Sequence, residues 1–78
     1  MSDRLIRLFA EGLQVPPDAL TDDSGPDNTP SWDSLAAMDL VALIEETFEV
    51  ELTTAEIMKM RTLGIAREVL REKGIQGI

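Results

Sequence analysis

Asp33 and Ser34 stand where a long polar loop gives way to a segment with helical spacing of apolar residues. Asp33 can cap that helix by accepting hydrogen bonds from the free N–H groups of its first turn. The Ser34 hydroxyl then lies in the exposed first turn, at the positive end of the helix dipole. Charge and hydrogen bonding both favour a phosphate group there. An isolated Asp-Ser pair is more often a cap alone, but this position would suit a phosphate-bearing serine.

The composition excludes most routes to catalysis. The 78 residues include no cysteine and no histidine. The chain therefore lacks a thiolate nucleophile, the commonest general base and the commonest metal ligands. A single domain of this size, residues 1–78, also has little room for a closed active site. We expect no catalytic residue and no enzyme.

The acidic loop fails the spacing of a calcium site. Counted from Asp22, an EF-hand needs glycine at its sixth position, where this chain has Asp27. Pro26 takes the position of a ligand. We predict no metal site.

Charge is distributed unevenly along the chain. The formal net charge is −8, and residues 8–58 hold 12 of the 15 acids and no basic residue. Such a block argues against nucleic-acid binding and favours partners with basic patches. No apolar run is long enough to cross a bilayer, and the N-terminus lacks a signal-peptide pattern. We therefore expect a soluble, cytoplasmic monomer.

The first expected helix follows Met1–Ser2 and ends before Pro16–Pro17, which forbid its continuation. Ser2 is its expected cap, and Asp3 favours its positive end. Its core stripe is Leu5, Leu8, Phe9 and Leu13. Residues 15–33 are then too rich in Gly, Pro, Asp and Asn for regular structure. Leu20 and Trp32 are expected to anchor this long loop in the core.

The second helix is expected over residues 34–48. Its core face comprises Ala37, Leu40, Val41, Ile44 and Phe48. The opposite side mixes carboxylates with exposed apolar residues, which is typical of a docking surface. The members of that face are Leu35, Met38, Asp39, Ala42, Glu45, Glu46 and Glu49.

Two shorter helices complete the expected fold. Thr53 and Glu56 form a capping box for a third helix ending near Lys59, with Ile57 and Met60 pointing inward. Thr62 caps the fourth helix, which Gly74 terminates. The core face of the fourth helix is Leu63, Ala66, Val69 and Leu70.

This arrangement resembles the acyl carrier protein family. The resemblance is carried by Asp33-Ser34-Leu35, Asp39-Leu40-Val41 and the acidic run at residues 45–49, and it covers nearly the whole chain. It implies an all-α, acyl-carrier-protein-like four-helix bundle with a long loop between helices 1 and 2 and a short third helix. It also implies that Ser34 carries 4′-phosphopantetheine, transferred from coenzyme A by a magnesium-dependent phosphopantetheinyl transferase. Asp33 and Leu35 flank this attachment site.

The family also implies partners for the second helix. Acyl-loading and acyl-processing enzymes would recognise it with basic docking patches. The implied recognition face is Leu35, Met38, Asp39, Ala42, Glu45 and Glu46.

Several residues depart from the fatty-acid carriers. Trp32 replaces a small residue, Ala36 and Ala42 replace an acid and a larger apolar residue, and the third helix has fewer acids, with Arg61 close by. These departures favour a specialised carrier of polyketide-type or modified acyl chains. Two other functions remain open: an aminoacyl carrier of D-alanyl or peptidyl groups, and an acidic helical adaptor that is never modified.

Overall fold

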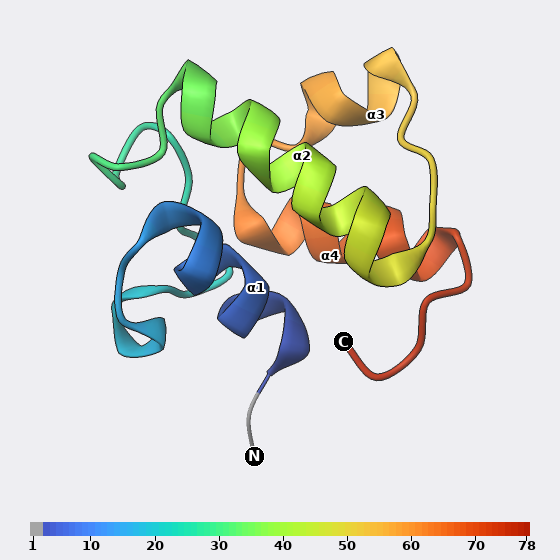
Figure 1. Ribbon diagram of the computed structural model, residues 1–78, viewed down its shortest axis with the longest axis horizontal. Coiled ribbons are helices and arrows are strands. Elements are labelled where there is room, and N and C mark those ends of the chain that lie inside the picture. Colours follow the sequence, from blue (N-terminus) through green and yellow to red (C-terminus); the bar gives the residue numbers. More distant parts are fainter. Residues whose placement is uncertain (1–2) are drawn as a thin grey trace.

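Four α-helices make up the fold in the computed structural model, which describes residues 3–78 (Figure 1). The helices are α1 (Arg4–Leu13), α2 (Ser34–Phe48), α3 (Thr54–Lys59) and α4 (Leu63–Glu72). In Figure 1, α2 crosses the molecule between α1 and α3, and α4 passes behind it. Residues 3–78 contain no β-strand. The predicted all-α bundle with a long first connection and a short third helix is confirmed.

The core lies between α1, α2 and α4. The predicted stripe of α1 is buried, and so are Leu20 and Trp32 from the long loop. The largest fully buried side chains are Phe9, Leu5, Leu40, Ile44, Leu63 and Leu70. A Cβ at Gly12 would lie 2.8 Å from Leu40 Cδ2, so glycine there lets α1 and α2 approach closely.

The α2 helix has the predicted bounds, but only part of its inner face is buried. Leu40, Ile44 and Phe48 are buried, whereas Ala37 and Val41 are only half-buried. The prediction that these two residues face the core is confirmed, although they are less buried than the other three. Both pack against the core and also line a pocket between α2 and α3, which leaves part of their surface uncovered.

Side chains cap the four helices. Asp3 Oδ1 accepts from the backbone N–H groups of Leu5 (3.0 Å) and Ile6 (3.2 Å), and it is the N-cap of α1. Ser2, the predicted cap, lies outside the described residues. The capping box of Thr53 and Glu56 is present as predicted, as is the Thr62 cap of α4.

The long loop is docked onto the start of α4. The carbonyl oxygens of Ser24 and Asp22 accept from the N–H groups of Leu63 and Gly64, each at 2.9 Å. A Cβ at Gly25 would lie 2.2 Å from the carbonyl oxygen of Arg61, so only glycine fits there. One short 3-10 turn, η1 (Pro17–Ala19), interrupts the loop that was predicted to be irregular.

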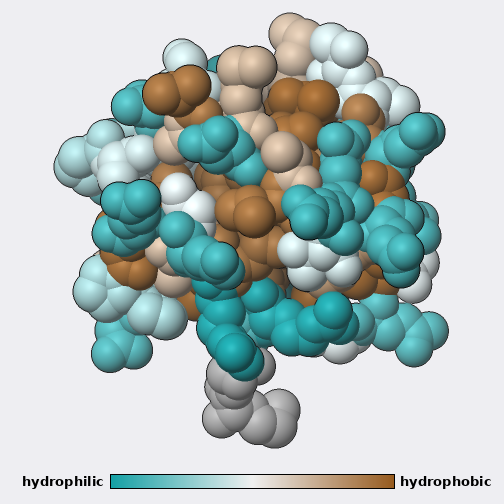
Figure 2. Space-filling model, viewed as in Figure 1, coloured by the Kyte–Doolittle hydropathy of each residue, from teal (hydrophilic) through white to brown (hydrophobic). Residues whose placement is uncertain are grey.

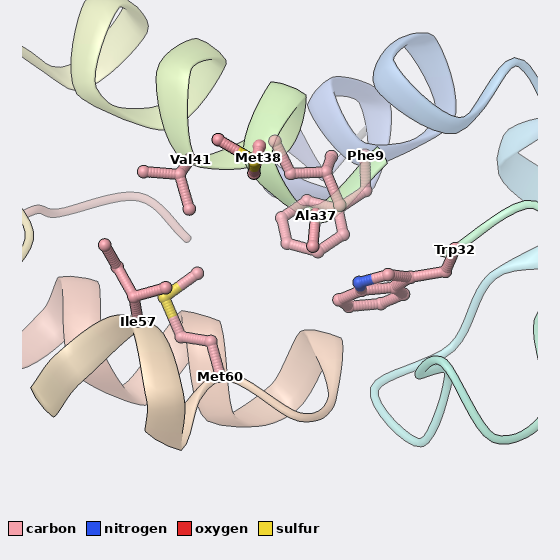
Figure 3. A pocket seen from close by; sticks show the side chains of 8 residues that line it. Phe9, Trp32, Ala37, Met38, Val41, Ile57 and Met60 are labelled. Atoms are coloured by element: carbon pink, nitrogen blue, oxygen red, sulfur yellow. The ribbon is translucent and has the colours of Figure 1, made fainter. Parts of the chain in front are cut away.

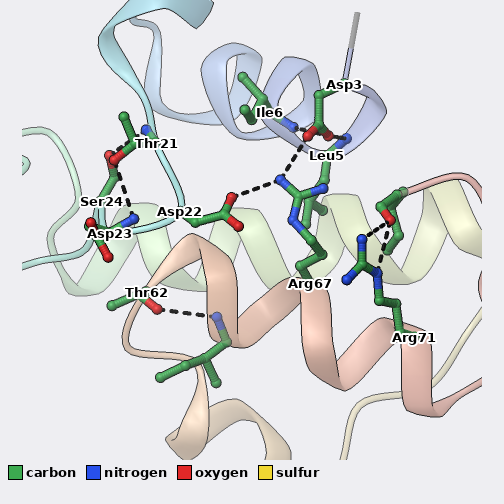
Figure 4. Close-up of polar contacts among 12 residues, drawn as sticks. Asp3, Leu5, Ile6, Thr21, Asp22, Asp23, Ser24, Thr62, Arg67 and Arg71 are labelled. Atoms are coloured by element: carbon green, nitrogen blue, oxygen red, sulfur yellow. Dashed lines mark hydrogen bonds and ion pairs between the residues drawn. The ribbon is translucent and has the colours of Figure 1, made fainter.

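Arg67 ties the same loop to α1 (Figure 4). Its guanidinium Nη2 lies 2.7 Å from Asp3 Oδ2 and 2.9 Å from Asp22 Oδ1. The hydrogen bond to Asp3 raises the pKa of Arg67, against the opposing effect of burial. Burial also works to raise the pKa of Asp3, but the hydrogen bonds from Arg67 and the backbone outweigh it, so that pKa lies below its usual value.

Candidate functional site

Ser34 is the first residue of α2 and is exposed to solvent. Asp33 directly before it caps the helix, with Oδ1 accepting from the N–H of Ala36 at 2.9 Å. Within residues 3–78, the Ser34 hydroxyl has no hydrogen-bond partner, and neither do the backbone N–H groups of Ser34 and Leu35. The site thus combines a free nucleophilic oxygen with two unused donors at a positive helix end.

This arrangement fits a phosphodiester on the hydroxyl. The two free N–H groups can donate to phosphate oxygens, and the helix dipole stabilises the negative charge. The exposed setting leaves the rest of a long substituent in solvent. A bulky phosphate ester at Ser34 therefore requires no rearrangement of the described residues.

A largely apolar pocket of about 320 Å³ lies next to this helix start (Figure 3). It opens between α2 and α3, and Phe9 of α1 contributes to its wall. It is lined by Phe9, Trp32, Ala37, Met38, Leu40, Val41, Ile57 and Met60. Because Trp32 and Ala37 stand on either side of Ser34 in the chain, the pocket adjoins the serine.

Trp32 is a buried part of the pocket wall, as are Phe9 and Leu40. Only 3% of the Trp32 surface is exposed. Its ring meets Phe9 edge to face, with ring centroids 5.3 Å apart and planes at 67°, a favourable aromatic geometry. The sequence predicted burial of Trp32 but gave no indication that it borders a pocket.

The outward side of α2 mixes apolar and acidic residues as predicted. Leu35 and Met38 are 72% and 71% exposed, and Asp39, Ala42 and Glu46 are exposed between and beyond them. Figure 2 shows hydrophobic surface in the upper half of the molecule, over α2 and α3, among hydrophilic residues. We call Leu35, Met38, Asp39, Ala42 and Glu46 the α2 face.

Glu45 differs from the other acids predicted for this face. It is half-buried, and its Oε2 accepts from the N–H of Leu52 at 2.9 Å. This hydrogen bond fixes the connection between α2 and α3. Its carboxylate is therefore less available to a partner than those of Asp39 and Glu46.

The α3 helix carries apolar surface that the sequence analysis missed. Ile57 faces α2 across the pocket, in the predicted inward direction, but it is 38% exposed and not part of the buried core. Met58, for which no role was predicted, is 73% exposed. Met60 is half-buried and lines the pocket. A helix of six residues is too short for the burial of its inner face to be assigned from spacing.

Residues 3–78 contain no helix long and apolar enough to cross a membrane. In the same part of the chain, no three acidic residues gather in the way a metal site requires.

A comparison with protein-family models relates this geometry to known proteins. The chain matches the family described as "PP-binding: Phosphopantetheine attachment site" over residues 3–64. The match runs from α1 through the long loop, α2 and α3 to the start of α4, which includes the free serine and the pocket. The chain therefore belongs to the phosphopantetheine-attachment family and is a carrier protein with covalently attached 4′-phosphopantetheine as its cofactor.

Proposed function

We propose that this protein is an acyl carrier whose Ser34 bears the phosphopantetheine. The prosthetic group supplies a thiol on a flexible arm, which holds an acyl chain as a thioester. The chain itself is then a substrate of other enzymes and performs no catalysis. The proposed setting is a cytoplasmic, specialised pathway with polyketide-type or modified acyl cargo.

The choice of Ser34 is supported by the state of the other described serines. Ser24 is 7% exposed, and its Oγ accepts from the N–H of Thr21. The Ser31 Oγ is buried without a partner, so a transferase has no access to it. Ser34 combines exposure with a free hydroxyl and a helix start.

The pocket is the observation that favours an acyl cargo over an aminoacyl cargo. All eight of its lining side chains are hydrocarbon, aromatic or thioether groups, and none carries a charge. An acyl chain gains free energy on entering such a space. An ammonium group would lose its hydration and find no carboxylate there. An aminoacyl group is therefore expected to stay in solvent.

The α2 face supports the proposed partners. Its exposed carboxylates lie beside exposed apolar side chains, an arrangement that suits a basic docking patch with a hydrophobic centre. We expect the phosphopantetheinyl transferase and the acyl-loading and acyl-processing enzymes to bind here. A partner bound to this face would lie beside the start of α2, where the phosphopantetheine arm is attached to Ser34.

Intact mass spectrometry tests the attachment site. Incubation with coenzyme A and a broad-specificity phosphopantetheinyl transferase should add one phosphopantetheine to the wild-type protein. Ser34→Ala should abolish the addition while circular dichroism stays unchanged, because Ser34 is exposed and Asp33 supplies the cap. Ser31→Ala is the matched control and should be modified normally. Modification of Ser34→Ala would overturn the assignment.

A second measurement tests the cargo. The transferase would load octanoyl or alanyl groups from their coenzyme A esters, and the fluorescence of Trp32 would be recorded. Since the chain has one tryptophan and no tyrosine, the signal reports the pocket wall alone. The octanoyl form should change the emission and the alanyl form should not. A change with alanyl alone would favour an aminoacyl carrier.

A further inference from the structure

Trp32 presents a hydrogen-bond donor to an otherwise apolar pocket. Its side chain is buried, yet its indole N–H donates to no acceptor among residues 3–78. The Ser31 hydroxyl oxygen and Arg67 Nε are fully enclosed and have no hydrogen-bond partner. The indole nitrogen is not enclosed in this way, so it can be reached from the pocket. In Figure 3 this nitrogen is turned toward the open space between α2 and α3.

Packing alone does not require this donor. A phenylalanine would make the same kind of edge-to-face contact with Phe9, without an N–H group to desolvate. A buried N–H without an acceptor costs free energy. A water molecule that enters the pocket can accept from this N–H, but it finds no second polar side chain among the other seven lining residues. Such a water is weakly held, and a ligand oxygen can replace it.

The tether determines what can reach this donor. Ser34 is two residues from Trp32 and within about one helical turn of Ala37 and Met38, which line the pocket. An arm attached to Ser34 therefore begins beside the pocket mouth. A chain that turns into the pocket brings its carbons against lining residues such as Val41 and Met60. An oxygen on the part of the chain beside Trp32 can then accept from the indole N–H.

We propose that Trp32 Nε1–H donates a hydrogen bond to an oxygen on the tethered chain, so that the pocket selects keto- or hydroxy-acyl groups over fully reduced chains of equal length. This inference rests on the proposed acyl-carrier function and narrows its cargo. A neutral oxygen satisfies the donor and brings no charge into the pocket. A binding site that forms a hydrogen bond to a polar group of its ligand discriminates against ligands that lack this group.

Nuclear magnetic resonance can observe this hydrogen bond directly. The wild-type protein, labelled with nitrogen-15, would be loaded from the coenzyme A esters of octanoate and of the matching β-keto octanoate. Intact mass would confirm loading at Ser34. Because Trp32 is the sole tryptophan, one indole signal reports the donor. We expect a downfield shift of its proton with the keto chain, well beyond any shift with the saturated chain.

A protection assay measures the selectivity. Hydroxylamine would cleave the two thioesters in the wild-type protein, in Trp32→Phe, and in a protein whose Trp32 indole is replaced by a benzothiophene ring, which keeps the shape but lacks the N–H. In both altered proteins, protection of the keto thioester from cleavage should fall about fivefold relative to that of the saturated thioester. A change of about fivefold is expected for one net hydrogen bond. The benzothiophene protein keeps this measurement valid if Trp32→Phe folds poorly.

The outcomes separate this inference from the function on which it rests. Failure to load any group at Ser34 would overturn the carrier proposal and this inference with it. Successful loading with equal indole shifts for the two chains, or with none, would overturn the role of Trp32 alone. The role of Trp32 would also be overturned if the keto chain, relative to the saturated chain, were protected equally well in the benzothiophene protein and in the wild type.

Discussion

Two regions of this molecule use carboxylates in opposite ways. Around Arg67, the carboxylates of Asp3 and Asp22 each lie within 3 Å of one buried guanidinium. On the α2 face, Asp39 and Glu46 are exposed and make no ion pair with residues 3–78. The first region uses charge to hold α1, the loop and α4 together. The second leaves its charge unpaired, which costs some stability and makes it available to a partner.

The largest expected effect lies in the paired region. Arg67→Met should lower the free energy of unfolding by about 2–3 kcal/mol, because it leaves two carboxylates unpaired and unties the loop from α1. The value is below that of a fully buried pair, because the Asp22 side chain is 58% exposed. Urea unfolding measures the change.

Arg71→Met is the matched control, since it removes the same charge from an exposed position on the same helix, where the guanidinium donates to the carbonyl oxygen of Ile78. It should cost less than about 0.5 kcal/mol. Equal losses from the two variants would mean that the Arg67 cluster contributes nothing specific.

The next effect lies on the α2 face and changes recognition without changing stability. Leu35→Ala should lower transferase kcat/KM by about 5- to 30-fold, equivalent to about 1–2 kcal/mol, if Leu35 is an interface anchor. Its unfolding curve should match the wild type, because the side chain is 72% exposed. Met58→Ala should lower kcat/KM by less, and any decrease would show that the docking surface extends onto α3. An unchanged kcat/KM for Leu35→Ala would remove it from the interface.

Charge reversal gives a smaller, salt-dependent effect. Asp39→Lys and Glu46→Lys should each slow phosphopantetheine transfer about three- to tenfold at low salt, and less at high salt, because they weaken the encounter with a basic partner. The control is Asp27→Lys in the exposed loop. Asp22 would be a poor control because it pairs with Arg67. Equal slowing by helix and loop reversals would show that partners respond to net charge alone.

The smallest effect is a pH dependence of the paired region. The folded pKa of Asp3 lies below the ordinary value of 3.8, so the carboxylate stabilises the fold above that pH. This stabilisation is lost as the pH falls through the folded pKa. Asp3→Asn keeps a capping side chain but removes the charge. It should be less stable by under about 1 kcal/mol at pH 7. The difference should shrink as the pH falls below 3.8 and vanish below the folded pKa of Asp3. A constant difference would exclude a contribution from ionisation.

Local patterns predicted most of the fold. The bounds of α2 follow from Asp33 and the spacing through Phe48, and those of α3 from its capping box. Burial of Leu20 and Trp32 followed from the need to anchor a long polar loop. Each of these features depends on residues close together in the sequence, which is why spacing and capping chemistry were sufficient.

The features that were missed depend on contacts between distant segments. The spacing of Leu63, Arg67 and Leu70 places Arg67 on the buried face of α4 and so indicated its burial. The charge of Arg67 instead favoured a position on the surface. The pocket arises because α3 has no buried residue and stands away from α2. No pattern within the sequence of a six-residue helix determines that distance. The attachment of phosphopantetheine to Ser34 is a prediction, which the mass measurement on Ser34→Ala tests.

The docking of the loop onto α4 has a consequence for hydrogen exchange. The first N–H groups of a helix normally have no partner and exchange quickly. Here those of Leu63 and Gly64 donate to carbonyl oxygens of Ser24 and Asp22, far earlier in the chain. Their exchange therefore requires the loop to open, whereas amides further along α4 depend on the helix itself. Deuterium uptake at these two amides should thus report loop opening separately from unfolding of α4.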